Sequence, residues 1–470
     1  MTRPHRAGTG EQVDHGSLDV VRDVLRPRYG PQTATWHVDP NGRRHLVPPV
    51  QAGSCFDLSH LALYLSPPAL FGEFRPASPW TGWTLRRETA LPVKTSRSQL
   101  RSVFDRTVEE LVAGHDAIAV RVSGGMDSAA VLSSLARVAS ADVQVTAFVT
   151  EAVADSGERA SEQASRIVRS VFRDRARAEI VVLPRSNVAA PAWSAVGPRL
   201  EGSPGRNAAA IAAAADVGAT LMLSGDGADE LLTTPAFLGR HMARAGAAFS
   251  LLRYLGDHRP ADLVATAVAS ATEFLLSRRI EAAAHVYNAL VSNPVVQGEA
   301  ALDPAFAARV REWSREYDGA LHDLLSELLA DGWAHAEAHL AIWPQDQLHL
   351  GSEIPVRSPF LEQPFVGHAL GLPLRERWDA ELPTPYLRRK AAVSVLLDPG
   401  VAAVLPRHKE GFSADLAGST FTDKDTPTLV DLGLVRAHTL VTDTATVLTL
   451  RALEDWVVGA LDRGYEPARS

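Results

Sequence analysis

The strongest chemical signal in the sequence is a glycine-rich turn at residues 123–128, Ser-Gly-Gly-Met-Asp-Ser. It follows an apolar, strand-like run at 117–122 and precedes a helical pattern at 129–138. A turn in this position presents backbone N–H groups at a helix N-terminus, and its glycines let the backbone approach an anion closely. We therefore predict a phosphate cradle, with an ordinary Gly-rich strand-to-helix turn as the alternative.

A second, acidic turn lies at residues 224–230, Ser-Gly-Asp-Gly-Ala-Asp-Glu, again directly after a predicted strand. In open α/β sheets, ligands bind where the carboxyl ends of the strands face a crevice, so both turns are expected to face one ligand. Asp127 and Asp229 are predicted to share a Mg²⁺ that neutralises a pyrophosphate. The alternative for the second turn alone is a solvated acidic loop. A P-loop ATPase is disfavoured because the chain has no GxxxxGK[ST] sequence.

A third signal is a lysine in a chain that has almost none. The lysines of the sequence are Lys94, Lys390, Lys409 and Lys424. Lys409 stands in the segment 407–413, Arg-His-Lys-Glu-Gly-Phe-Ser. A fixed cation near an α-phosphate would stabilise the charge that develops when a carboxylate attacks the phosphorus. The alternative for this segment is a surface loop of mixed charge.

The elements that position these residues alternate between short apolar runs and helical patterns. Strands are predicted at 117–122, 143–150, 179–183 and 220–223, and a helix at 98–114. Beyond residue 235 the pattern is mostly helical, with apolar periodicity at 249–255, 263–276 and 321–340. The predicted fold class is α/β, a doubly wound parallel sheet with a mostly helical C-terminal layer.

Residues 1–95 differ from the rest, since they are dense in proline, glycine and isolated aromatic residues. We predict a short N-terminal mixed region at 1–95, with a strand at 33–38, and a second domain at 96–470. Trp36, Trp80 and Trp83 are expected to pack in a core or at its edge, with peptide docking as the alternative.

Composition excludes several functions. The net charge of −8 and pI near 6.1 provide no basic field, so no nucleic-acid partner is expected. Cys55 is the only cysteine, which excludes an intrachain disulfide, and it is expected to be a small buried residue. The apolar stretch at 208–223 reads as helix then strand, and the N-terminus has no secretory signal pattern, so no membrane role and a cytoplasmic location are expected. His335 and His339 are interpreted as part of an amphipathic helix, since the zincin pattern is absent.

In this order and at this separation, the three motifs resemble the synthetase domain of asparagine synthetases, enzymes of the pyrophosphate-loop (PP-loop) type. The resemblance spans roughly residues 101–415 and includes Asp346 and the segment 356–362, Val-Arg-Ser-Pro-Phe-Leu-Glu. It implies an adenine-nucleotide alpha hydrolase-like sheet and an ATP- and Mg²⁺-dependent ligase that activates a carboxylate as its acyl-adenylate. One departure is Pro355, which stands where the family has a Glu, so that role is absent or moved to Glu353.

The resemblance also implies site residues. The nucleotide is expected to contact Val122, Ser123, Gly124, Gly125, Asp127, Ser128, Phe148, Val149, Gly225 and Arg357. The adenine would lie against Val122, Phe148 and Val149. Asp127 and Asp229 would hold Mg²⁺, Lys409 would stabilise charge, and Asp226 would orient the substrate or accept a proton.

Within the family, residues 224–235 and 409–415 are most similar to the lasso-peptide macrolactam synthetases. This similarity implies adenylation of an Asp or Glu side chain in a precursor peptide and attack by the peptide's own N-terminal amine. A leader peptidase and a leader-binding protein would be partners. The alternatives are a small-molecule amide or β-lactam synthetase and an ammonia-dependent asparagine synthetase. Glutamine hydrolysis in cis is not expected, because Thr2 replaces the nucleophilic Cys and the front segment is short.

Two other classes fit less well. A non-catalytic nucleotide-binding regulator would have no need of Lys409 beside Asp127 and Asp229. A tRNA or sulfur-transfer enzyme is disfavoured by the acidic pI and by the absence of a CxxC pair.

Overall fold

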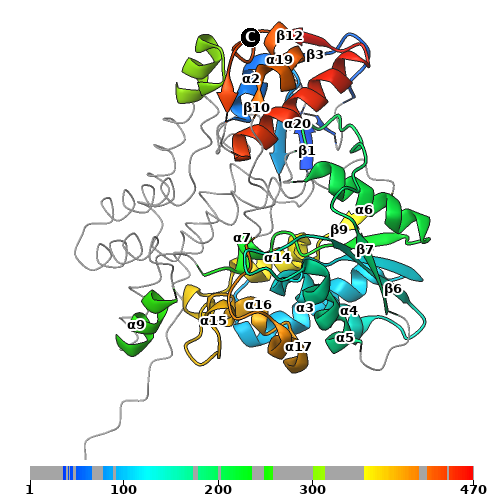
Figure 1. The fold of residues 1–470 in the computed structure, drawn as a ribbon, viewed down its shortest axis with the longest axis vertical. Coiled ribbons are helices and arrows are strands. Elements are labelled where there is room, and N and C mark those ends of the chain that lie inside the picture. Colours follow the sequence, from blue (N-terminus) through cyan, green and yellow to red (C-terminus); the bar gives the residue numbers. More distant parts are fainter. Residues whose placement is uncertain are drawn as a thin grey trace, which may run out of the picture.

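The computed structural model describes residues 35–38, 41, 43–45, 49–65, 78–87, 92–172, 178–199, 203–234, 248–257, 300–312, 354–411, 421–441 and 444–468. Its elements gather in two regions (Figure 1). One region is built around a parallel sheet. In the other, segments from near the two ends of the chain lie side by side.

The parallel sheet has five strands in the order β7-β6-β5-β8-β9. Their bounds are β5 Ala117–Arg121, β6 Gln144–Thr150, β7 Ala178–Leu183, β8 Leu221–Leu223 and β9 Val356–Arg357. From β5 the chain runs outward through β6 to β7, and then crosses to the other side of β5 to form β8 and β9. The predicted doubly wound α/β sheet is confirmed. The strand order reverses between β5 and β8, which is where such sheets bind ligands.

Each strand predicted for this parallel sheet lies within one residue of an observed one. The helix predicted at 98–114 is α3, Arg97–Val112. The helix predicted from residue 129 begins three residues earlier, because extended Gly125 is the N-cap of α4, Met126–Val138. Asp127 and Ser128 therefore belong to the first turn of this helix rather than to the loop before it.

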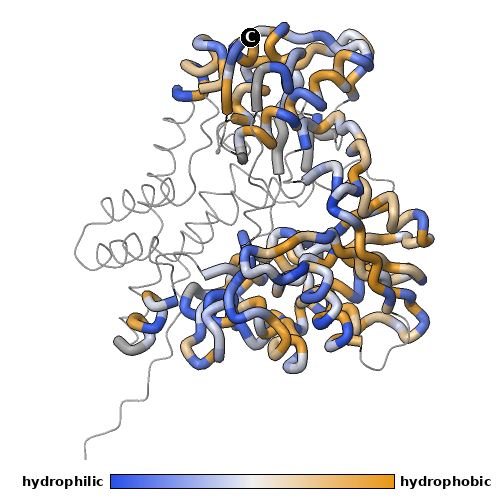
Figure 2. Tube along the Cα trace, viewed as in Figure 1, coloured by the Kyte–Doolittle hydropathy of each residue, from blue (hydrophilic) through white to orange (hydrophobic). Residues whose placement is uncertain are grey.

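The side chains of β5 point alternately to the two faces of the sheet, and helices pack on both faces. Ile118 and Val120 pack into a core with α3, α4 and several further helices. These further helices are α5 Ala160–Val171, α7 Ala228–Leu232, α14 Gln363–Leu370, α15 Pro385–Arg389, α16 Ala391–Ser394 and α17 Pro399–Val404. Ala119 faces the opposite side and packs against α6, Pro204–Asp216. Hydrophobic residues accordingly run through the sheet (Figure 2).

The second region joins early and late segments of the chain. Strand β3, Cys55–Asp57, pairs in parallel with β12, Glu466–Ala468. A shared core contains Phe56, Trp80 and Trp456, and it includes residues of α2, Leu58–Leu63, α19, Pro427–Asp431, and α20, Thr444–Leu461. The domain boundary near residue 95 stays a prediction.

The remaining elements are short. They are β1 Thr35–Val38, β2 Arg44–His45, β4 Thr84–Arg87, α9 Ala248–Gly256, η4 Pro359–Leu361, η5 Leu374–Glu376, β10 Phe421–Thr422, η6 Asp423–Asp425 and β11 Leu440–Val441. Strand β1 and helix α9 confirm the strand predicted at 33–38 and the helix predicted at 249–255. The helical patterns at 263–276 and 321–340, which include His335 and His339, lie outside the described residues.

Trp80 is buried and Trp83 packs at the edge of the same core, as predicted. The side chain of Trp36 lies outside the described residues. The prediction for Cys55 was wrong, because its side chain is partly exposed. Cys55 lies at the partly exposed start of β3, and burial begins with the next two residues, Phe56 and Asp57. Among the described helices, none has both the length and the apolar character needed to cross a membrane.

Candidate active site

The glycine-rich loop after β5 is braced by its own serines. Ser128 Oγ donates to the Gly125 carbonyl at 3.2 Å and accepts from the Ser123 N–H at 3.3 Å. Gly124 has a φ of +78°, a conformation that glycine adopts without strain. The Met126 N–H at the start of α4 donates to Tyr386 Oη at 3.0 Å. The loop thus presents the N-terminus of α4 at the carboxyl edge of the sheet.

The acidic turn after β8 packs directly against this loop. A Cβ on Gly225 would stand 2.8 Å from the Ser128 nitrogen, so only glycine permits the contact. Gly227, with a φ of +87°, starts α7 and places Asp229 in that helix's first turn. The glycine-rich loop and the acidic turn therefore meet because β5 and β8, the strands that they follow, are neighbours in the sheet.

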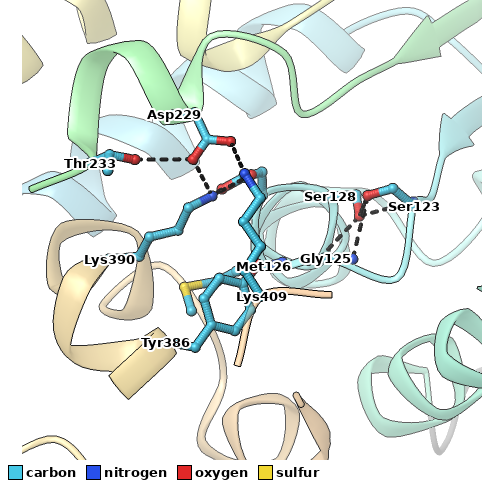
Figure 3. Close-up of polar contacts among 10 residues, drawn as sticks. Ser123, Gly125, Met126, Ser128, Asp229, Thr233, Tyr386, Lys390 and Lys409 are labelled. Atoms are coloured by element: carbon cyan, nitrogen blue, oxygen red, sulfur yellow. Dashed lines mark hydrogen bonds and ion pairs between the residues drawn. The ribbon is translucent and has the colours of Figure 1, made fainter. Parts of the chain in front are cut away.

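Four charged side chains from distant segments meet at this junction (Figure 3). Lys390 Nζ lies 2.7 and 2.6 Å from the two carboxylate oxygens of Asp127, and 2.7 Å from Asp229 Oδ1. Lys409 Nζ lies 2.8 Å from Asp229 Oδ2. Thr233 Oγ1 donates to Asp229 Oδ1 at 3.0 Å. The predicted meeting of Asp127, Asp229 and Lys409 is present in the structure, and Lys390 stands between the two acids.

Burial and charge act in opposite directions on these groups. Burial lowers the pKa of the Lys390 ammonium, but the charges of Asp127 and Asp229 outweigh it, so the net shift is upward. Burial raises the pKa of Asp229, but the two lysines outweigh it and leave that pKa well below its usual range. Burial and the Asp229 charge raise the pKa of Asp127 against the attraction of Lys390. Lys390 is therefore charged and Asp229 is ionised.

Two further groups beside the cluster have raised pKa values. Burial, together with the charges of Asp229, Asp226 and Asp127, raises the pKa of Glu230 to about 7. Burial raises the pKa of Tyr386 to about 12, so its hydroxyl keeps its proton at neutral pH. Glu230 is thus a group near the site that changes charge close to neutral pH.

A cavity of about 280 Å³ opens beside the cluster. Its lining residues are Ser123, Gly124, Gly125, Asp127, Ala154, Glu158, Arg159, Ala160, Gln163, Asp229, Tyr386, Pro406, Lys409 and Glu410. The glycine-rich loop, the acidic turn and the Lys409 segment share this one cavity. Arg159, which precedes α5 and is 59% exposed, adds a further cation to the wall.

The Lys409 segment is tied to the loop after β6. The Asp155 N–H donates to the Gly411 carbonyl at 2.8 Å. A Cβ on Gly411 would meet the Asp155 carboxylate, so the Asp155 side chain would have to move to admit any other residue at this position. The tie holds Lys409 over the cavity although its side chain is 53% exposed.

Asp226 lies apart from this cavity. Its two carboxylate oxygens accept hydrogen bonds from Arg121 Nη2 at 2.7 and 2.6 Å, and Arg121 Nη1 donates to Asn207 Oδ1 at 2.9 Å. The Asp226 carbonyl accepts from Ser358 Oγ at 2.6 Å. The predicted role of Asp226 in orienting substrate or accepting a proton stays a prediction, and in this structure its carboxylate is paired with an arginine.

The residues predicted to contact adenine are core residues. Val122, Phe148 and Val149 are each at most 1% exposed, and their contact with a base stays a prediction. Phe148 packs on the α6 side of the sheet, and the two valines pack on the other. Arg357 lies on β9, where it forms an ion pair with Glu362 at 2.7 Å, and it does not line the cavity. Asp346 and Glu353 lie outside the described residues.

Sequence reasoning assigned no role to Lys390, Tyr386 or Arg159. Lys390 and Tyr386 lie in the stretch Thr384-Pro-Tyr-Leu-Arg-Arg-Lys390, which matches none of the motifs considered. The rarity of lysine was the one available signal, since it left few candidates for a cation at the site.

The donor chemistry of the site fits Mg²⁺. Asp127 and Asp229 direct carboxylate oxygens at one point, and Mg²⁺ in nucleotide sites usually takes one or two carboxylates together with phosphates and waters. Within the described part of the chain, no three His, Cys, Asp or Glu side chains cluster closely enough to hold a metal ion alone. A metal ion here would therefore take part of its coordination from a nucleotide.

The chain matches the family model of asparagine synthase over residues 99–444, which is more than half of its length. No curated protein matches it significantly. The matched span contains the glycine-rich loop, the acidic turn and Lys409. The family is a ligase family whose enzymes use ATP, so the match supports ATP-dependent amide-bond ligase activity. The chain belongs to the asparagine synthase family.

Proposed function

We propose that this protein is an AMP-forming ligase that adenylates a carboxylate and joins it to an amine. The observation that carries the proposal is the convergence of Asp127, Asp229 and Lys409 on one cavity at the switch point of the sheet. A lysine exposed at this cavity and paired with Asp229 is suited to stabilise charge that develops during a reaction, which a module that only binds a nucleotide does not require.

The residues of the site divide the work. The N-terminus of α4 and its glycine loop bind the pyrophosphate portion of ATP through backbone N–H groups. Mg²⁺, when bound, neutralises phosphate charge and thereby makes pyrophosphate a better leaving group. The substrate carboxylate attacks the α-phosphorus and pyrophosphate leaves. The amine then attacks the acyl carbon, which yields the amide, AMP and a proton.

Lys409 is placed to act in both steps. Its ammonium is exposed at the cavity, so it can contact the phosphorus-bound oxygens as the first bond forms. In the second step, the same cation stabilises the oxyanion that forms on the acyl carbon. Arg159, another residue of the lining, adds positive charge to the cavity.

We further propose that the substrate is a lasso-type precursor peptide. An Asp or Glu side chain of the peptide is activated, and its own N-terminal amine closes a macrolactam ring. Support comes from the amino-acid sequences of residues 224–235 and 409–415, which are more similar to those of lasso-peptide cyclases than to those of asparagine synthetases. A prefolded peptide held in the site would bring its two reacting ends together before activation. A leader peptidase and a leader-binding protein would then supply the substrate.

The test is ATP–pyrophosphate exchange and AMP release with purified protein. Three conditions are compared: no substrate, aspartate with ammonia, and a leaderless lasso-type core peptide. Lys409→Ala and Asp127→Ala are the site variants, and Lys424→Ala, at an exposed lysine outside the cavity, is the matched control.

Peptide-dependent AMP formation, with the loss of one water from the peptide mass, is the expected result. AMP formation with aspartate alone would move the substrate to the asparagine synthetase alternative. If neither aspartate nor the peptide supports AMP formation, the ligase proposal stands but its substrate is another carboxylate, such as that of a β-lactam precursor. No nucleotide turnover or binding under any condition would overturn the enzymatic proposal.

A further inference from the structure

Lys390 stands at the point on which the two metal-binding carboxylates converge. Its ammonium contacts both oxygens of Asp127 and one oxygen of Asp229, all within 2.7 Å. Figure 3 shows the contact between Lys390 and Asp229. Its side chain is only 4% exposed, whereas that of Lys409 is 53% exposed. Lys390 is therefore a built-in part of the site, and Lys409 reaches it from the solvent side.

The local fold fixes the backbone of this lysine. Lys390 is both the C-cap of α15 and the N-cap of α16, and its carbonyl accepts from the Val393 and Ser394 N–H groups. One turn earlier, Tyr386 of α15 accepts the Met126 N–H, which ties this helix to the start of α4. The helix that carries Lys390 is thus docked on the helix that carries Asp127.

An ammonium and a divalent ion cannot share this point. Mg²⁺ coordinates oxygens at about 2.0–2.1 Å, and two cations placed between the same carboxylates would repel each other strongly in a poorly solvated site. Conversely, two carboxylates directed at one buried point would repel each other without a cation between them. Some cation is needed at this position whether or not a nucleotide is bound.

We propose that Lys390 is a place-holder cation. In the nucleotide-free protein it occupies the divalent-ion position between Asp127 and Asp229, so the carboxylates are neutralised and the ion site is closed. Mg²⁺ then enters only together with the triphosphate, whose negative charge draws the ammonium away from the carboxylates. This inference rests on the proposed nucleotide site, but its central claim concerns the protein before any nucleotide binds.

The charge balance supports this role. Lys390 and Lys409 together offset Asp127 and Asp229, so the cluster is neutral without a metal ion. Removal of the Lys390 charge would leave two carboxylates beside a single, half-exposed lysine. Such a site would acquire affinity for a divalent cation on its own.

The experiment is a Mn²⁺ titration followed by electron paramagnetic resonance, with and without a non-hydrolysable ATP analogue. The proteins are the unmodified chain, Asp127→Asn, Lys390→Met, the double variant Lys390→Met/Asp127→Asn, and Lys94→Met as a control at an exposed lysine. Lys390→Gln is a second variant that keeps hydrogen-bond donors toward the carboxylates. Circular dichroism shows which variants fold.

The unmodified protein is expected to bind Mn²⁺ at this site only when the analogue is present. Lys390→Met is expected to bind Mn²⁺ without nucleotide at least about tenfold more tightly than the unmodified protein, since a like charge has been removed. The added Asp127→Asn change should abolish this gain, and Lys94→Met should behave as the unmodified protein.

Two results would overturn the proposal. One is nucleotide-independent Mn²⁺ binding by the unmodified protein that Asp127→Asn removes, a result that does not require any Lys390 variant to fold. The other is a folded Lys390→Met or Lys390→Gln protein that gains no Mn²⁺ site. If the analogue fails to bind the unmodified protein, the proposed function fails, while the nucleotide-free titrations still decide the role of Lys390.

Discussion

The backbone of Gly225 lies against that of Asp127 so closely that a Cβ on Gly225 would stand 2.9 Å from the Asp127 carbonyl carbon. The same Cβ would stand 2.8 Å from the Ser128 nitrogen. Both atoms belong to the backbone of α4, so they can move only if the helix moves. This contact sets the separation of the two turns and, with it, the position of Asp229 relative to Asp127.

Gly225→Ala is therefore expected to disturb both stability and the site. Overpacking against a rigid backbone costs about 1–3 kcal/mol in the free energy of unfolding, and displacement of the acidic turn should weaken binding of Mg²⁺ and ATP. Urea unfolding and a nucleotide titration measure the two effects. Gly256→Ala, in α9 and with open space around the new methyl group, is the control and should change neither. Unchanged stability and affinity in Gly225→Ala would contradict the close contact.

The sheet could be predicted from the sequence because its central strands are short apolar runs bounded by turn residues. The glycine-rich loop and the acidic turn each follow such a run, so their placement at one edge of the sheet followed from the parallel topology alone. The start of α4 was misplaced by three residues, since the pattern does not distinguish an N-cap glycine from a loop glycine.

Long-range pairings could not be predicted. Lys390 meets Asp127 across 263 residues of sequence, and its position follows from how α15 docks on α4. Likewise, β3 and β12 are only three residues long, and their pairing joins an early and a late segment of the chain without any periodicity that marks it. The adenine contacts of Phe148 and Val149 stay a prediction, and both residues are buried because both faces of a central parallel strand are covered.

Variants of the Arg121–Asp226 pair can distinguish a structural role of Asp226 from a catalytic one. The two side chains are 27% and 20% exposed and share two short hydrogen bonds. Asp226→Asn is expected to lower the free energy of unfolding by about 1.5–3 kcal/mol, because it weakens charge-assisted hydrogen bonds. Arg121→Gln should cost a similar amount, and the double variant should cost less than the sum. Denaturant unfolding of the four proteins gives the coupling. If Asp226→Asn kept full stability and lost only turnover, Asp226 would act on the substrate instead.

The raised pKa of Glu230 predicts that the free energy of unfolding falls as the pH rises. Its folded-state pKa of about 7 lies above its ordinary value of 4.5, so between these values the native state binds a proton that the unfolded state does not. The stabilisation is complete below pH 4.5 and is lost as the pH rises through 7, with a slope of at most about 1.4 kcal/mol per pH unit. Urea unfolding between pH 5 and pH 8 measures it. Glu230→Gln should flatten this part of the profile, whereas Glu162→Gln, at an exposed position on α5, should not. An identical profile in Glu230→Gln would show that another group titrates.

Lys409 should affect turnover without affecting stability. Its ammonium is half-exposed and its ion-pair partner, Asp229, is also bound by Lys390, so Lys409→Ala should change the free energy of unfolding by less than about 0.5 kcal/mol. If the ammonium stabilises developing charge, kcat should fall by about 10²–10³, with the nucleotide still bound. Lys409→Arg should recover part of the rate, because it keeps the charge but not its shape. Lys424→Ala controls for the loss of a surface lysine. Single-turnover AMP formation and thermal unfolding on the same samples separate the two effects. A large stability loss in Lys409→Ala, or a fall in nucleotide affinity that accounts for the whole loss of rate, would assign Lys409 to the architecture of the site rather than to the reaction.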